Sequence, residues 1–383
     1  MKTELCIFDK SVNLLRFPPD KNSNNSLQAW DSADEYLIET VEEMECLTDS
    51  SRILIINDQF GALSCWFHQY PITSQSDSWV SALATQFNAK KNDIDMSQIT
   101  FAGSHDSLQG HYDLVLIKVP KNNTYLEHLL CNLKPCISDK THVIAAGKTT
   151  DIHTSTLKIF EKIIGETKTS LAKKKSRLIF STSNQLPVAS PDPIIWQTEA
   201  ALTGKPLTLI NFANVFSAGS LDIGARAFIP ALPSTHAPVR ILDLGCGNGV
   251  IGQAALLKNP DSSITFVDES YAAIASAKAS LQENFPDDYQ RHQFILSDSL
   301  SELRDQKFDL VLCNPPFHQQ KTITDHIAMQ MFTDARHVLN KGGELRIVGN
   351  RHLQYHVKLK RLFGHVTTVA SNKKFVVLSC VKR

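Results

Sequence analysis

Val239-Arg-Ile-Leu-Asp-Leu-Gly-Cys-Gly-Asn-Gly-Val-Ile-Gly252 is the stretch of sequence that decides the fold. It opens with an apolar run typical of a buried strand and continues as a glycine-rich turn that leads into a helix rich in alanine and leucine. Glycine suits such a turn because the backbone must bend sharply and lie close to a ligand. The start of the helix points free N–H groups at that ligand. The stretch therefore predicts a strand, a ligand-binding loop and a helix of an α/β protein.

Apolar, strand-like runs alternate with helical stretches after this loop, which is typical of a parallel sheet covered by helices on both faces. The last two runs flank Ser371-Asn-Lys-Lys374, so we expect them to form an antiparallel hairpin. This is the seven-stranded, Rossmann-like arrangement of class I methyltransferases. The predicted strands are Val239–Leu244, Ile264–Val267, Gln293–Leu296, Phe308–Cys313, Glu344–Val348, Val366–Ala370 and Phe375–Cys380, with a helix at Leu353–Phe363.

The first half of the chain repeats this pattern. Arg52-Ile-Leu-Ile-Ile-Asn-Asp58 aligns with Arg240-Ile-Leu-Asp-Leu-Gly-Cys246, and Tyr112-Asp-Leu-Val-Leu-Ile-Lys118 aligns with Phe308-Asp-Leu-Val-Leu-Cys-Asn314. The order is the same in both halves, which indicates a duplicated domain. We therefore expect two tandem α/β domains of the class I methyltransferase type.

Length and composition agree with two domains. The chain has 383 residues, with 39 Lys and Arg against 39 Asp and Glu, which is too long for one core and excludes a polycation that binds through charge alone. The proline- and serine-rich segment Ser181–Pro193 breaks any helix or strand and separates the halves. The predicted domains are residues 1–188 and 189–383.

Other sequence features predict a monomeric cytoplasmic protein without a metal site. No apolar run is long enough to span a membrane, and Met1–Lys10 is charged where a signal peptide needs apolar residues. The 8 cysteines include no C-x-x-C pair, so we interpret them as reduced thiols.

Charge is distributed unevenly along the chain. Residues 27–50 carry only acidic charges, which we interpret as a solvated face. Residues 341–383 carry ten Lys or Arg and the single acid Glu344. Such a surplus is either another solvated face or the contact surface for a phosphate-rich partner such as RNA.

The glycine loop alone admits two cofactors. Gly247-x-Gly249-x-x-Gly252 also satisfies the dinucleotide fingerprint, which leaves an NAD-dependent oxidoreductase as an alternative. Asp243 favours S-adenosylmethionine, because a carboxylate there would repel a pyrophosphate but suits the positively charged methionine end of the methyl donor.

Two further carboxylates follow the next strands. Asp268 ends the second strand, where it can accept both hydroxyls of a ribose. Asp298 follows the third strand, where it either meets the adenine amine or caps the next helix. Phe216-Ser-Ala-Gly-Ser-Leu-Asp-Ile-Gly224 is either a loop that closes over the cofactor or a simple turn. The predicted cofactor-binding residues are Asp243, Gly245, Gly247, Gly249, Asp268, Asp298, Gly219 and Asp222.

Asn314-Pro-Pro-Phe-His318 follows the fourth strand and suits methylation of an amine on a conjugated ring. The lone pair of such a nitrogen is delocalised, so the enzyme must hold it in line with the methyl group. Asn314 and the carbonyl of Pro315 can each accept one N–H, while Phe317 can stack on the base. An ordinary turn is the alternative, but both loops open at the same carboxyl edge of the sheet. The predicted catalytic residues are Asn314, Pro315, Pro316 and Phe317.

The first half keeps these strands but not their loops. Asn57-Asp-Gln-Phe-Gly61 replaces the glycine loop, and Lys118-Val-Pro-Lys121 replaces the Asn-Pro-Pro loop. We therefore expect the first domain to bind no cofactor and to lack a catalytic site.

Taken together, these motifs behind a degenerate copy resemble the bacterial ribosomal RNA guanine-N2 methyltransferases, and the large-subunit enzymes most closely. Val267-Asp-Glu-Ser270 belongs to the same resemblance, which covers nearly the whole chain and is strongest from Asn214 to Arg383. The resemblance implies methylation of the N2 amine of a guanine in 23S ribosomal RNA. It also implies that the first domain assists RNA recognition or folding.

Four other functions stay open at this point. The Asn-Pro-Pro-Phe loop alone also fits adenine-N6 DNA enzymes and glutamine-N5 protein enzymes, so the choice of guanine rests on the resemblance. The oxidoreductase is a third enzyme class. A noncatalytic RNA-binding protein would require Asn314 to be idle.

Overall fold

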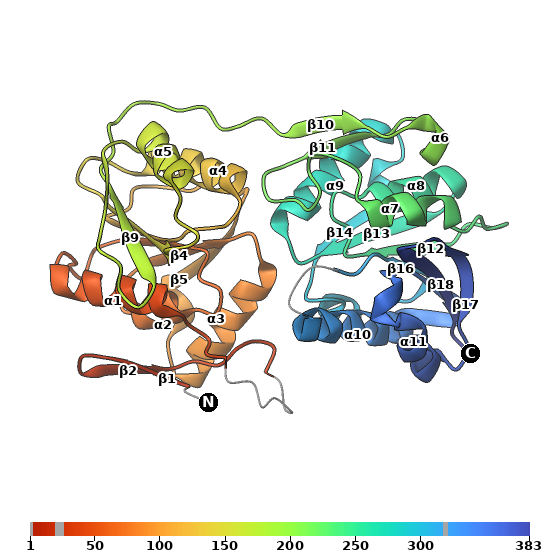
Figure 1. Cartoon of the computed structure of the whole chain (residues 1–383), viewed down its shortest axis with the longest axis horizontal. Helices are drawn as coiled ribbons and strands as arrows, with labels where there is room; N and C mark the ends of the chain where they lie inside the picture. The colour runs from red at the N-terminus through yellow and green to blue at the C-terminus, as the bar shows by residue number, and fades with distance from the viewer. Residues whose placement is uncertain (1–2, 20–26, 317–320) are drawn as a thin grey trace. The chain divides into compact units, whose positions relative to one another are not determined.

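The computed structural model describes residues 3–19, 27–316 and 321–383 (Figure 1). For residues 321–325 only the backbone is described. The chain separates into unit 1, Met1–Asp192, and unit 2, Pro193–Arg383. Each unit contains one seven-stranded sheet and one two-stranded hairpin. The predicted pair of α/β domains is confirmed.

The sheet of unit 2 has the strand order β14-β13-β12-β15-β16-β18-β17. The first five strands are parallel, and β18 lies antiparallel between β16 and β17, as the terminal hairpin predicted. The strands are β12 (Arg240–Leu244), β13 (Ser263–Asp268), β14 (Gln293–Leu296), β15 (Phe308–Cys313), β16 (Leu339–Asn350), β17 (Thr367–Ser371) and β18 (Phe375–Val381). The helices are α6 (Ala200–Thr203), α7 (Ile223–Phe228), α8 (Val250–Lys258), α9 (Tyr271–Asn284), α10 (Lys321–Val338) and α11 (Tyr355–Phe363).

The central strand β12 shows why this sheet is covered on both faces. Ile241 belongs to the core formed with α7, α8 and α9, whereas Leu242 and Leu244 belong to the core formed with α10 and α11. Side chains of a strand alternate between the two faces of a sheet, so an apolar residue is needed at nearly every position. Asp243 is the exception, and it faces α8.

Unit 1 repeats the same topology, with the order β5-β4-β3-β6-β7-β9-β8. The register agrees with the sequence alignment: Ile53 pairs with Leu114 in unit 1, as Ile241 pairs with Leu310 in unit 2. Its sheet contains β3 (Ile53–Ile56), β4 (Ile72–Ser76), β5 (Ile99–Gly103), β6 (Leu114–Lys118), β7 (His142–Lys148), β8 (Thr167–Thr169) and β9 (Ser176–Ser181). Its helices are α1 (Ser32–Met44), α2 (Ala62–Trp66), α3 (Trp79–Lys91), α4 (Asn123–Leu133) and α5 (Thr154–Ile163).

Each unit also begins with a hairpin that the sequence pattern did not reveal. These are β1 (Glu4–Ile7) with β2 (Lys10–Asn13), and β10 (Ile194–Gln197) with β11 (Thr208–Asn211). The backbone N–H of Leu15 donates to Asn88 Oδ1 of α3 at 2.9 Å, and that of Ile210 donates to Ser280 Oγ of α9 at 2.9 Å. A polar side chain of a distant helix therefore holds the chain just after β2 and at β11.

No helix in the described part of the chain is long and apolar enough to cross a membrane. Within the same residues, no group of three or more His, Cys, Asp and Glu side chains is arranged to hold a metal ion.

Candidate active site

The glycine loop after β12 adopts a backbone that other residues rarely adopt. Gly245, Gly247 and Gly249 have φ angles of 72°, 54° and 78°, in the left-handed region. A Cβ atom added at Gly247 would meet nothing within 4 Å, so the backbone borders open space there. Asn248 Nδ2 donates to Asn211 Oδ1 of β11 at 2.9 Å and ties the loop to the hairpin. The loop is therefore built to let a ligand approach its backbone closely.

Asp243 lies beneath this loop and is only 1% exposed. Its Oδ2 accepts the backbone N–H of Gly252 at 2.8 Å, in the first turn of α8. A side chain at Gly252 would clash, because its Cβ would lie 2.5 Å from Phe266 Cε1. Burial raises the pKa of Asp243 to about 8, although the hydrogen bond from Gly252 opposes this. The electrostatic argument for the methyl donor therefore applies to the ionised form of Asp243, and its role toward the cofactor stays a prediction.

Asp268 joins the glycine loop to α9. Its Oδ2 accepts the N–H of Gly247 at 3.0 Å, and its Oδ1 accepts the N–H of Ser270 at 3.0 Å. Asp268 is half-buried and stands where β13 ends, beside the open face of Gly247. This is the place at which the sequence predicted an acceptor for ribose hydroxyls.

Asp298 follows β14 and is half-buried. Burial and the charge of Asp334 raise its pKa, while a hydrogen bond from Gln330 of α10 opposes the shift. The helical turn that follows has Leu300 at its N-cap, without a side-chain cap. The structure therefore does not support the capping alternative, and the contact to adenine stays a prediction.

The segment 214–224 wraps around the same edge of the sheet. Val215 packs against Ala272 and Ala273 at the start of α9, and Trp196 Nε1 donates to the carbonyl of Ala218 at 2.9 Å. A Cβ atom at Gly219 would meet nothing within 4 Å. Asp222 is the N-cap of α7 and accepts the N–H of Ala225 at 2.9 Å. The segment is therefore anchored by specific contacts and leads into a helix of the core. That it closes over the cofactor stays a prediction.

Asn314, at the end of β15, lies next to this segment. Its Nδ2 donates to Asp222 Oδ2 at 3.2 Å. Its Oδ1 is buried and has no hydrogen-bond partner among the residues that the structure describes. Pro315 is buried and Pro316 is half-buried, whereas Phe317 and His318 lie outside the described residues. The arrangement leaves one strong acceptor available for a ligand.

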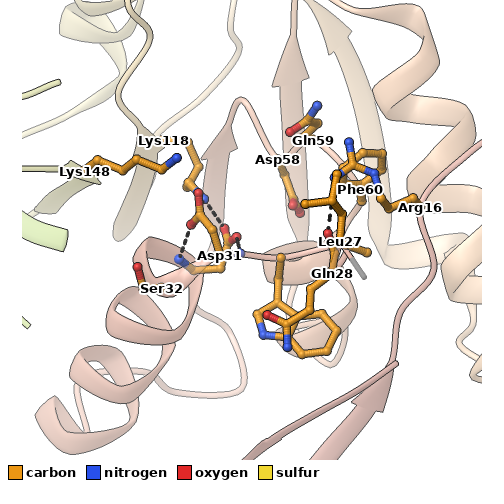
Figure 2. A pocket seen from close by; sticks show the side chains of 13 residues that line it. Arg16, Leu27, Gln28, Asp31, Ser32, Asp58, Gln59, Phe60, Lys118 and Lys148 are labelled. Carbon is orange, nitrogen blue, oxygen red and sulfur yellow. Dashed lines mark hydrogen bonds and ion pairs between the residues drawn. The ribbon is translucent and has the colours of Figure 1, made fainter. Parts of the chain in front are cut away.

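The corresponding position in unit 1 carries an ion-pair cluster instead. Lys118 occupies the register position of Asn314, and its ammonium lies 2.8 Å from Asp31 Oδ1 and 2.7 Å from Asp34 Oδ1. Figure 2 shows Lys118 and Asp31 facing each other in this pocket, whose volume is about 440 Å³. Burial raises the pKa of Asp34 to about 6 against the effect of Lys118. Burial alone would lower the pKa of Lys118, but the two carboxylates raise it above its usual value.

The loop of unit 1 keeps two of the three left-handed positions of the glycine loop. Asn57 and Gly61 have φ angles of 64° and 80°, at the places of Gly245 and Gly249. The side chain of Asn57 donates to the carbonyl of Lys118 at 3.1 Å and accepts from Tyr125 Oη at 3.1 Å. Asn57 thus ties the loop to the end of β6 and to α4, beside the pocket that Asp58, Gln59 and Phe60 line. That unit 1 binds no cofactor stays a prediction.

Two contacts of the site were missed by the sequence reasoning, namely Asn314 with Asp222 and Asn248 with Asn211. The residues of each pair are far apart in the chain, so no local spacing reveals them. The internal repeat could have indicated the first pair, because an aspartate, Asp31 or Asp222, precedes the first central strand in each unit.

Known protein families and proteins match this chain over nearly its whole length. Residues 2–185 match the family described as the RLMG N-terminal domain, and residues 206–379 match the methyltransferase small domain. The chain is 50% identical over 376 residues to the ribosomal RNA large subunit methyltransferase G of Pseudoalteromonas translucida (strain TAC 125), with 98% of this chain and 97% of that protein covered. It is 47% identical over 386 residues to the protein of the same name from Vibrio campbellii (strain ATCC BAA-1116), with 100% and 98% covered.

A solved structure shares the two-unit fold. The T. thermophilus 16S rRNA N2 G1207 methyltransferase (RsmC), in complex with AdoMet and guanosine, superposes with a TM-score of 0.78 at 20% sequence identity. The match covers 100% of this chain and 98% of that chain. At this identity, the likeness is one of fold.

We expect Asp268→Ala to weaken the binding of S-adenosylhomocysteine about ten- to a hundredfold, the usual effect of losing a hydrogen bond to a charged group. Titration calorimetry measures it. Asp268→Asn is the matched control: it keeps an acceptor and should show a smaller loss. An unchanged dissociation constant for the alanine variant would remove Asp268 from the cofactor site.

We expect the affinity for S-adenosylmethionine to rise with pH between about pH 6 and about pH 7, by up to about tenfold. The pKa of Asp243 near 8 means that its proton must leave before the carboxylate can face a positive charge. The thiols of Cys246 and Cys313 beside it have raised pKa values and stay neutral in this window. Calorimetry in two buffers of different ionisation enthalpy should record the released proton. Asp243→Asn should bind without proton release, and an equal affinity of the wild type across this range would contradict the prediction.

Proposed function

Because the chain belongs to the ribosomal RNA large subunit methyltransferase G family, we propose that unit 2 transfers a methyl group from S-adenosylmethionine to the N2 amine of a guanine in 23S ribosomal RNA. The relatives are named for the large subunit, and the structural neighbour is named as a guanine-N2 enzyme with bound AdoMet and guanosine. Since these relatives are named as methyltransferases, we discard the alternative function as an NAD-dependent oxidoreductase. The glycine loop with Asp243 and Asp268 fits the methyl donor, because Gly247 borders open space next to a half-buried carboxylate.

The observation that carries this proposal is the buried Oδ1 of Asn314, which has no hydrogen-bond partner in the described part of the chain. A buried acceptor without a partner is costly, so such an atom calls for a ligand that donates a hydrogen bond. The exocyclic amine of guanine offers two N–H groups. Asn314 Oδ1 accepts one and the carbonyl of Pro315 accepts the other, which holds the lone pair toward the methyl group.

The chemistry is then divided between cofactor and protein. When bound, S-adenosylmethionine supplies an electrophilic methyl group on a sulfonium. Asn314 and Pro315 fix the amine and favour its pyramidal form, in which the lone pair is no longer shared with the ring. Stacking of the base on Phe317 stays a prediction, because that residue lies outside the described residues.

RNA contacts are best supported where basic side chains share an edge with Asn314. β16 ends at Asn350, which pairs with Phe375, so the turn before β18 lies at the carboxyl edge of the sheet. Lys373 and Lys374 are in this turn, and the N–H of Arg351 donates to the carbonyl of Lys374 at 3.0 Å. All three side chains are exposed. We assign the phosphate contacts to them.

The other basic residues of this region lie elsewhere. Lys360 and Arg361 are in the last turn of α11, which leads away from the carboxyl edge before β17 returns toward it. The sequence grouped Lys358, Lys360 and Arg361 with the lysines of the turn, and the topology separates the two sets. Unit 1 is assigned to RNA recognition or structural support, in a monomeric cytoplasmic enzyme that binds one methyl donor per chain.

Asn314→Ala should leave the binding of S-adenosylhomocysteine and RNA nearly intact and slow single-turnover methyl transfer about a hundred- to a thousandfold, because it removes one positioned acceptor. Asn340→Ala is a matched control, since Asn340 also donates to a carboxylate, Asp309, at the opposite end of β15. Its rate should equal that of the wild type.

Mass spectrometry of the nucleosides identifies the product, which should be N2-methylguanosine. N6-methyladenosine would keep the mechanism and overturn the choice of base. A full rate for Asn314→Ala would overturn the mechanism, whereas the absence of methyl transfer by the wild type would leave a noncatalytic RNA-binding protein as the better interpretation.

Replacing both Lys373 and Lys374 by alanine should lower RNA affinity for all sequences and flatten its salt dependence by about 0.7 per contact for a single strand. The matched control replaces Lys360 and Arg361, which removes the same charge from α11. Filter binding at several salt concentrations gives both slopes. Equal slopes of RNA affinity against salt concentration for the two double variants would indicate that the turn is an ordinary solvated surface.

A further inference from the structure

We propose that Asp222 is a positioning residue that sets the direction of the Asn314 amide, an inference that rests on the proposed function. Asp222 was predicted from the sequence as a cofactor-binding residue. In the structure, its Oδ2 accepts two N–H groups of the protein, from Ala225 at 2.9 Å and from Asn314 Nδ2 at 3.2 Å. The first bond caps α7, and the second joins α7 to the end of β15.

The chemistry of the two groups explains why this contact matters. An asparagine amide has one accepting and one donating end of nearly equal size, and either end can face a given direction. A carboxylate only accepts. The Asn314 amide must therefore turn its NH2 group to Asp222, which leaves Oδ1 as the end that faces away. A flipped amide would present donors to an amine that also donates, and only the carbonyl of Pro315 would remain as a hydrogen-bond acceptor for that amine.

The capping role of Asp222 makes it a firm anchor. A side chain that accepts the N–H of Ala225 is held against the first turn of α7. Ala225 and Phe228 of that helix are buried in the core of unit 2. The direction of the Asn314 amide is thus fixed by a helix packed in the core rather than by a free surface carboxylate.

Unit 1 repeats this pairing with a different partner, which is independent support. Asp31 is the N-cap of α1 and accepts the N–H groups of Ala33 and Asp34. Its Oδ1 also contacts Lys118, at the register position of Asn314. In both units the N-cap carboxylate of the helix before the first central strand contacts the residue at the end of the fourth strand. The geometry therefore holds whether the strand ends in an amide or an ammonium group.

The test separates positioning from helix capping. Asp222→Ser keeps a good N-cap, but its shorter side chain should lose Asn314. We expect kcat to fall about ten- to a hundredfold, with KM for RNA, the affinity for S-adenosylhomocysteine and the melting temperature close to wild type. Asp222→Asn retains an oxygen that can accept from both N–H groups and should restore part of the rate. Asp31→Ser in unit 1 is the matched control and should leave the single-turnover rate at saturating RNA unchanged.

A double-mutant cycle makes the conclusion specific. If Asp222 acts through Asn314, Asp222→Ser should have no further effect on the rate of the Asn314→Ala enzyme. An equal loss in both backgrounds would overturn the positioning role, as would a wild-type kcat for Asp222→Ser. Weaker S-adenosylhomocysteine binding with unchanged kcat would also overturn it and assign Asp222 to the cofactor. A wild-type rate for Asn314→Ala would instead refute the acceptor role of Asn314, and a product other than N2-methylguanosine would refute the proposed function, so the failures are distinguishable.

Discussion

The reversal of strand order at the centre of each sheet is the constraint on which both sites depend. In unit 2 the chain runs outward from β12 to β14 and then crosses back to place β15 on the other side of β12. The loops after β12 and β15 therefore leave the sheet edge in opposite directions and leave a crevice between them. The glycine loop lies on one side of that crevice and Asn314 on the other. Asp268 and Asp222 then fasten each side to a neighbouring helix.

The two units show what one change at this edge does. A lysine buried at the place of Asn314 needs nearby carboxylates, because a buried charge without a partner is very costly. Lys118 finds them in Asp31 and Asp34. The same ammonium would repel the sulfonium of a methyl donor, and it offers no acceptor to an amine. The contacts that stabilise unit 1 are therefore the contacts that make methyl transfer there unfavourable.

Strong local patterns made much of the fold predictable. The sequence located all seven strands of the sheet in unit 2, the terminal hairpin and the duplication, because buried strands are continuous apolar runs. The hairpins β1–β2 and β10–β11 were missed, since each strand has only four residues and is held by polar side chains of a distant helix. The glycine loop was predicted because its three left-handed residues leave a local signature. The contact of Asn314 with Asp222 was not predicted, because a contact between residues 92 positions apart leaves no local signature in the sequence.

The dual use of one carboxylate explains how the degenerate unit kept its fold. An aspartate that both caps a helix and contacts the end of the fourth strand retains the first role when the second is lost. Unit 1 therefore has the same helix cap as unit 2, with an ion pair in place of the hydrogen bond to an amide. Asp58 and Asp243 form a second pair of similar contacts. Asp58 lies two residues beyond β3 and accepts the N–H of Ser64 at 2.8 Å. In unit 2, Asp243 lies within β12 and accepts the N–H of Gly252. In both units a carboxylate therefore accepts an N–H in the first turn of the helix after the first central strand, but only unit 2 has glycine at all three left-handed positions of its loop.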